Sequence, residues 1–164
     1  MVPFPVGPSD VLYCRFLLTH LREPGALLAA WGTQLRPRGR LLVEEAEWIR
    51  TRHPTFAAYL DIVEGVLASE SKRLYVGPTL DALGHVGGLT RATSAVARLP
   101  VSNRQAAGMF FLNAAAWKDH AYVRARHDPA AIGRLEEDLR ALAATPGAAS
   151  DIEWGLRQLV FERR

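Results

Sequence analysis

Residues 10–45 read DVLYCRFLLTHLREPGALLAAWGTQLRPRGRLLVEE, and the fold class is predicted from this stretch. The apolar run at residues 10–14 follows a turn-rich segment, which indicates a loop that enters a buried strand. Apolar residues then recur at helical spacing over residues 23–35, and Pro24 suits the first turn of that helix. The segment Pro37-Arg-Gly breaks the helix, and residues 40–45 form a second short strand. Strand, helix and strand within about 35 residues predict a parallel βαβ unit and the α/β class.

The rest of the chain continues this alternation. A short helix is expected around Leu80, Leu83 and Val86, and it should stop at the Gly87-Gly88 pair. Further helices are expected at residues 53–71, 106–126 and 129–144, and further strands at residues 93–101 and 152–163.

Length and composition indicate a globular chain of one domain. The chain has 164 residues, of which 49% are apolar and 23% are charged. Its single cysteine, Cys14, excludes an internal disulfide framework and a multi-cysteine metal site. No apolar run approaches about 18 residues and the N-terminus lacks the pattern of a signal peptide, so we expect a cytoplasmic protein that does not span a membrane.

The charge pattern argues against nucleic acid as a partner. The net charge is +3, but all basic residues except Lys72 and Lys118 are arginine, and they are scattered along the chain. Scattered basic residues favour a solvated surface over a nucleic-acid groove. The histidines also show no metal-ligand spacing, so no metal site is expected.

Four stretches, in order along the chain, resemble landmarks of the class I S-adenosylmethionine-dependent methyltransferases. They are PFPVGPSDVLYCRFLLTHL at residues 3–21, LRPRGRLLVEE at 35–45, GLT at 88–90 and WGLRQ at 154–158, which resemble the regions of the family's fourth, fifth, sixth and seventh strands. The resemblance implies a partial Rossmann-like sheet of about four strands with a helical insert. The strand order should be first, second, last, third, and the last strand should be antiparallel to its neighbours.

The resemblance covers only the C-terminal half of that family's fold. Its glycine-rich turn and its ribose-binding acid, which belong to the first three strands, have no counterpart in this sequence. We therefore expect a single domain, residues 1–164, made of a half Rossmann-like core (1–102), a helical insert (103–150) and a final strand (151–164).

Two functions stay open. The chain is either part of a methyltransferase that acts on a small molecule when the other half is supplied, or a non-catalytic remnant that serves as a dimerisation or binding module. Binding of S-adenosylmethionine by this chain alone should be weak. Because strand 10–14 would have an open edge, the expected partner is a second copy or a separate N-terminal-half chain.

The candidate cofactor-binding residues are Cys14 and Arg15, which end the first strand. Ligands of open α/β sheets bind at such strand ends, and the resemblance implies that these residues line the methionine side of the cofactor. A buried thiol and a solvated arginine are the alternative interpretation. His20, at the entry to the helix, would by resemblance lie near the mouth of the site and act as a base, although a histidine that caps or packs the turn is commoner.

The candidate acid–base residues are Glu44 and Glu45 at the end of the second strand, with Glu47 just beyond them. Because the strand is expected to end there, all three should point toward the same cleft. A desolvated carboxylate of such a group can serve general acid–base chemistry. The alternative is a polar strand end that meets water.

Overall fold

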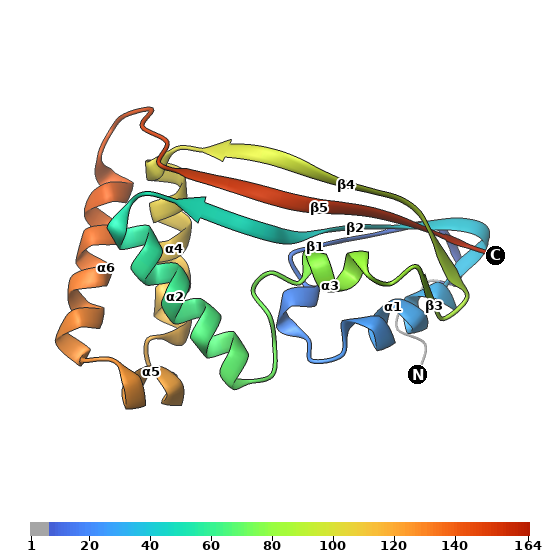
Figure 1. Cartoon of the computed structure of the whole chain (residues 1–164), viewed down its shortest axis with the longest axis horizontal. Coiled ribbons are helices and arrows are strands. Elements are labelled where there is room, and N and C mark those ends of the chain that lie inside the picture. Colours follow the sequence, from blue (N-terminus) through green and yellow to red (C-terminus); the bar gives the residue numbers. More distant parts are fainter. Residues whose placement is uncertain (1–6) are drawn as a thin grey trace. The chain divides into compact units, whose positions relative to one another are not determined.

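The strands of the chain form one five-stranded sheet in the order β1-β2-β5-β4-β3, as seen in a computed structural model that describes residues 7–164 (Figure 1). Their bounds are Ser9–Arg15 for β1, Leu35–Thr51 for β2, His85–Val86 for β3, Leu89–Val101 for β4 and Ile152–Arg163 for β5. The order expected for four strands is confirmed, and the two-residue β3 is an addition at one edge. Residues 3–6 of the predicted N-terminal loop lie outside the described residues.

The sheet is mixed. Strands β1 and β2 are parallel, with Leu12 beside Leu41. Strands β2 and β5 run in opposite directions. The end of β5 meets the start of β2, where Arg163 donates to the carbonyl of Leu35, and the earlier residue Gln158 donates to the later residue Glu44. This confirms the expected antiparallel last strand, which Figure 1 shows running back toward the C-terminus between β2 and β4.

The predicted second strand is much longer in the structure, because the Pro37-Arg-Gly segment does not interrupt it. Ser9 lies beside Leu35, but Val11 already lies beside Arg40, so the extra residues of β2 bulge out of the ladder. Arg38 adopts a φ of 65° within this bulge. The bulge absorbs the breaker residues, and β2 continues past the predicted end at residue 45 to Thr51.

The helices are α1 (Pro24–Gly32), α2 (Pro54–Ser69), α3 (Gly77–Asp81), α4 (Asn103–Trp117), α5 (Ala121–Arg126) and α6 (Pro129–Ala144), with a short 3₁₀ helix η1 at Leu18–His20. The helix predicted over residues 106–126 is therefore two helices. The second of them, α5, has His120 as its N-cap, and the Nδ1 of His120 accepts the N–H of Tyr122 at 3.2 Å.

The prediction for the Gly87-Gly88 pair was wrong. Helix α3 ends at Asp81, before the pair, and the two glycines connect β3 to β4. Their φ angles are 51° and 80°, and a two-residue hairpin turn of this kind needs positive φ at both central positions. Gly-Gly supplies this geometry as readily as it ends a helix.

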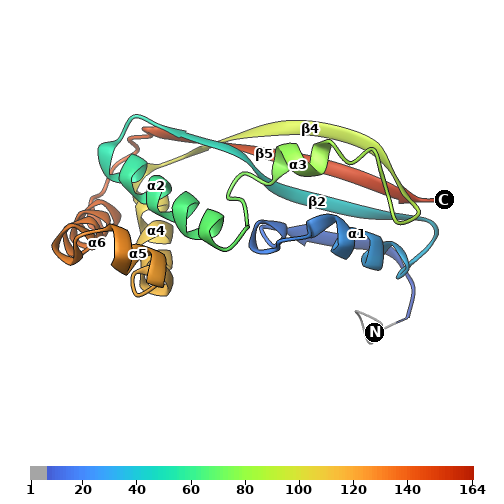
Figure 2. The same ribbon diagram turned by 60° about the horizontal axis from the view of Figure 1, so that its bottom comes forward.

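The chain divides into two compact units, and unit 1 comprises residues 1–48, 75–98 and 155–164. Helices α1 and α3 lie on one face of its strands (Figures 1 and 2). Leu28 of α1 and Leu80 of α3 are fully buried in one core cluster with Leu41 and Phe161 of the sheet. On the opposite face of β1, Tyr13 is 63% exposed.

Unit 2 comprises residues 49–74 and 99–154, and in it α2 packs with α4, α5 and α6. Its core is aromatic: Phe110 stacks on Tyr59 with ring centroids 4.0 Å apart and meets Phe56 edge-on. Helix α2 thus groups with the helices of residues 103–150, although the sequence placed it in the segment 1–102. No helix among residues 7–164 is long and apolar enough to cross a membrane.

Candidate functional site

The candidate site is the loop that follows β1, residues 15–20. It leaves the carboxyl end of a strand that is parallel to its neighbour, which is where open α/β sheets bind ligands. Phe16 turns the chain with a φ of 52°, and its N–H donates to the carbonyl of Glu44 at 3.1 Å. The chain then enters the single turn of η1, which ends at His20.

Glu45 binds the backbone of this loop. Its side chain is fully buried, and its Oε1 accepts the N–H groups of Leu17 at 2.8 Å and Leu18 at 2.7 Å. Its Oε2 is buried and has no hydrogen-bond partner among the described residues. Burial raises the pKa of Glu45, and the backbone donors oppose that rise. Glu45 is buried beneath the loop and positions its backbone.

Cys14 belongs to the same buried group. The residue is 5% exposed, and its Sγ lies 3.9 Å from Oε1 of Glu45. Burial, together with the Glu45 charge, raises the pKa of the Cys14 thiol to about 11. The thiolate is therefore scarce near neutral pH, and the Cys14 side chain lies in the core.

Glu44 points to the opposite face of the sheet from Glu45. Its carboxylate pairs with Arg15 Nε at 2.8 Å and accepts the Gln158 amide at 2.6 Å. The expectation that Glu44, Glu45 and Glu47 share one cleft is therefore wrong. Strand β2 does not end near them, and successive residues of a strand point to alternate faces.

Glu47 belongs to a polar network, centred on Arg157, that the sequence did not indicate. The Nε–H of Arg157 donates to Glu47 at 2.9 Å. Its Nη1 lies 3.3 Å from Asp81 and 2.8 Å from Ser94. The Glu47 carboxylate raises the pKa of Arg157. Arg157 is the arginine of the WGLRQ stretch, and its partner on β2 is 110 positions away, so local spacing carried no signal of the pair.

The loop surface consists of Arg15, Phe16, Leu17 and His20. Phe16 is 36% and Leu17 44% exposed, and the Arg15 guanidinium lies 4.7 Å from the Phe16 ring centroid. His20 is exposed at the end of η1. The sequence singled out Arg15 and His20 but missed the two apolar residues, because an apolar residue beside a buried strand is normally a core residue.

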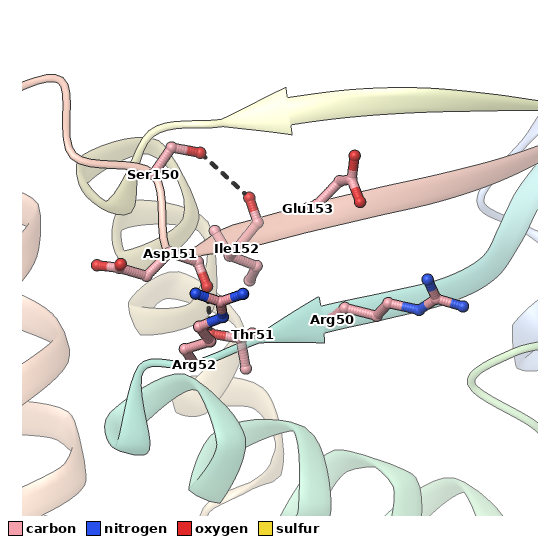
Figure 3. Close-up of a pocket in the computed structure, with 7 residues that line it drawn as sticks. All are labelled: Arg50, Thr51, Arg52, Ser150, Asp151, Ile152 and Glu153. Atoms are coloured by element: carbon pink, nitrogen blue, oxygen red, sulfur yellow. Dashed lines mark hydrogen bonds between the residues drawn. The ribbon is translucent and has the colours of Figure 1, made fainter.

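A separate cleft of about 470 Å³ lies in unit 2 (Figure 3). Seven residues line it: Arg50, Thr51, Arg52, Ser150, Asp151, Ile152 and Glu153. The hydroxyl groups of Ser150 and Thr51 donate to backbone carbonyls, and the hydroxyl of Thr51 lies 2.9 Å from the carbonyl of Asp151. None of the residues predicted from the sequence lines this cleft. Its charges have mixed signs, and it shows no cluster suited to catalysis.

The structure shows no arrangement of metal ligands among residues 7–164. His120 caps α5 through Nδ1, and its Nε2 lies 3.3 Å from Glu70.

The fold is that of the class I S-adenosylmethionine-dependent methyltransferases, which confirms the resemblance predicted from the sequence. One similar solved structure is a provisionally assigned methyltransferase from Bacillus halodurans C-125. It has a TM-score of 0.50 and 12% identity, over 99% of this chain and 67% of that one.

Two further structures are more distant. A provisionally assigned type II methyltransferase from Anaeromyxobacter dehalogenans has a TM-score of 0.48 and 17% identity, over 96% of this chain and 66% of that one. Mycolic acid cyclopropane synthase CmaA1, solved with SAH, has a TM-score of 0.47 and 16% identity, over 96% of this chain and 56% of that one.

These comparisons describe the fold alone. No protein family and no curated protein matches the chain by sequence. Across these and other similar structures, the chain spans from 33% to 67% of the other chain's length.

Proposed function

We propose that this chain takes part in S-adenosylmethionine-dependent methyl transfer to a small-molecule acceptor, and that its loop 15–20 lines the methionine side of the cofactor. The observation that carries the proposal is the exposed loop at the carboxyl end of β1, in a chain with this fold. A cytoplasmic location and the nature of the acceptor stay predictions.

The loop residues fit the methionine part of the cofactor. The Nε of Arg15 pairs with Glu44. Because the Arg15 side chain is 43% exposed, its other N–H groups can bind the methionine carboxylate. Phe16 and Leu17 offer apolar surface for the chain beside the sulfonium. When bound, the cofactor supplies a methyl group on a positively charged sulfur.

His20 is the candidate base of the loop. In methyl transfer the acceptor atom forms a bond to the methyl carbon as the sulfur–carbon bond breaks, and the acceptor gives up its proton. His20 is exposed on the loop and would take this proton. Alignment of the acceptor with the methyl group supplies most of the remaining rate enhancement.

A binding or dimerisation module without catalysis is the second candidate. It is favoured because the two predicted acid–base carboxylates already have partners within the chain. Glu45 is buried beneath the loop and binds its backbone, and Glu44 is paired with Arg15.

The test is an NMR titration of the ¹⁵N-labelled chain with S-adenosylhomocysteine. We expect shifts confined to residues 14–20 and a Kd weaker than about 100 μM, because the loop contacts only one end of the ligand. The variant Arg15→Ala should lose the shifts, whereas Leu112→Ala, on the exposed surface of α4, should keep them. Absence of shifts in the loop at millimolar ligand would contradict the cofactor role.

The two candidates differ in one further measurement. With the other half of the fold supplied, a methyltransferase should transfer the labelled methyl group from S-adenosylmethionine, and His20→Ala should lower the rate without removing the shifts. A chain that shows the shifts but no transfer under those conditions is a binding module.

A further inference from the structure

Unit 2 has a groove along helix α4 that shares no lining residue with the cleft of Figure 3. Its volume is about 810 Å³, within the range of about 300–1,000 Å³ that is usual for small-molecule sites. One wall is the first part of α4, and the other is the end of α6 with the loop that follows it. Nine residues line the groove, among them Arg104, Gly108, Met109, Leu112, Ala143 and Ala148.

Arg104 is the one charged residue among these nine. It is exposed, and no carboxylate among residues 7–164 pairs with its guanidinium. It also lies in the first turn of α4, where the positive end of the helix dipole adds to its charge. A guanidinium in this setting favours an anion, and a carboxylate matches its planar donors with two parallel hydrogen bonds.

The rest of the groove changes from open to apolar along one face of α4. Arg104, Gly108 and Leu112 are spaced four residues apart, so they follow one another on the same face over about 12 Å. A Cβ at Gly108 would meet nothing within 4 Å, so the space between the arginine and the leucine is open. Leu112 is 72% and the adjacent Met109 38% exposed. The face therefore suits a molecule with an anionic head and an apolar tail.

Hydrogen bonds fix the loop wall of the groove against the start of α4. The Asn103 side-chain amide donates to the Asp151 carboxylate at 2.7 Å and accepts the N–H of Asp151 at 2.8 Å. The N–H of Asn103 donates to the carbonyl of Ala149 at 2.7 Å. Ser102 and Gln105 form a capping box at the same end. Because the walls are held within the chain, a ligand meets a groove that is already formed and needs little ordering on binding.

We propose that this groove binds a free medium-chain fatty acid, with its carboxylate on Arg104 and its hydrocarbon chain over Gly108, Met109 and Leu112. One arginine balances one carboxylate. A membrane surface is a poorer match, because helices that bind anionic lipid surfaces carry several lysine or arginine residues. The proposal depends on residues of unit 2 alone and is independent of the role of loop 15–20.

The carboxylate contact is tested by an NMR titration of the ¹⁵N-labelled chain with dodecanoate below its micelle concentration. We expect shifts at residues 102–112 and 143–148. Arg104→Gln should weaken binding about tenfold or more, because it removes the charge-assisted pair. Arg134→Gln, at an exposed arginine of α6 that does not line the groove, is the matched control and should leave binding unchanged. Dodecanol, with the same chain and no carboxylate, should bind more weakly than dodecanoate and should not distinguish Arg104→Gln from the wild type.

The apolar contact is tested by Gly108→Leu. Its side chain enters open space, so thermal denaturation should show no loss of stability, while dodecanoate binding should weaken about tenfold or more. Absence of shifts at residues 102–112 with millimolar dodecanoate overturns the proposal. Equal binding of dodecanol and dodecanoate, or binding that neither Arg104→Gln nor Gly108→Leu weakens, overturns it as well. Sedimentation of the chain with phosphatidylglycerol vesicles in the absence of those shifts would overturn it in favour of a membrane surface.

Discussion

Replacing Glu45 tests whether this carboxylate builds the loop after β1. Glu45→Ala leaves the N–H groups of Leu17 and Leu18 without the acceptor they now reach at 2.8 and 2.7 Å. A buried donor without a partner costs about 1–3 kcal/mol. Part of this loss is offset because the variant no longer buries a carboxylate, so we expect a net destabilisation of about 2–4 kcal/mol.

The measurement is chemical denaturation near neutral pH at one fixed protein concentration. Glu45→Gln keeps a carbonyl oxygen for the two N–H groups and should lie within about 1 kcal/mol of the wild type. Glu44→Ala removes an ion pair whose arginine side chain is 43% exposed, and should also cost about 1 kcal/mol or less. The reasoning fails if Glu45→Ala is as stable as the wild type, or if Glu45→Gln is as damaging as Glu45→Ala.

The pH dependence gives an independent check of the same residue. The pKa of Glu45 is raised above its ordinary value of 4.5, so between that value and its higher folded pKa the native state binds more protons than the unfolded chain. The free energy of unfolding must then fall as the pH rises through this window. Its neighbour Cys14, with a pKa of about 11, does not titrate there. Glu45→Gln should lose this part of the slope, and equal slopes in both proteins would exclude a raised pKa.

Two further predictions concern packing and reactivity. A Cβ at Gly155 would lie 2.2 Å from the Trp48 ring, so Gly155→Ala should lower stability by about 1–3 kcal/mol in thermal or chemical denaturation. Gly108→Ala, in helix α4 with nothing within 4 Å, should instead raise it by about 0.5–1 kcal/mol, and equal effects of the two variants would refute the packing argument. Cys14 should react with iodoacetamide near pH 8 at least about 100-fold more slowly in the folded chain than in denaturant, because a pKa of about 11 leaves little thiolate. Fast labelling of the folded chain would show that the thiol is accessible.

The elements that local pattern alone specifies were predicted almost to the residue. Helix α6 and strand β5 occupy residues 129–144 and 152–163 as expected, since a proline and a glycine-containing loop bound them and their periodicity is uninterrupted. The hairpin at Gly87-Gly88 and the bulge at Arg38 were missed. Both depend on positive φ angles. A Gly-Gly pair suits a hairpin turn as well as the end of a helix, and the bulge depends on the pairing of β2 with β1, which no local window shows.

The candidate site was less predictable because its interactions join distant parts of the chain. Glu45 meets the backbone of Leu17 and Leu18 across 28 and 27 positions, and backbone donors carry no side-chain signal at all. Arg157 meets Glu47 across 110 positions. In each case the sequence shows a charged residue in a strand, and only the fold reveals that the charge is used inside the protein.

The arrangement of the acidic residues also bears on the proposed methyl transfer. Glu44 and Glu45 are adjacent in a strand, so they point to opposite faces and cannot act as an acid–base pair. Glu45 and Glu47 lie two residues apart and share a face, but the first serves the loop backbone and the second serves Arg157. We therefore propose that the proton acceptor for a ligand at the end of β1 comes from the loop, where His20 is the exposed imidazole. For this reason His20, rather than the carboxylates, is the residue whose replacement separates catalysis from binding.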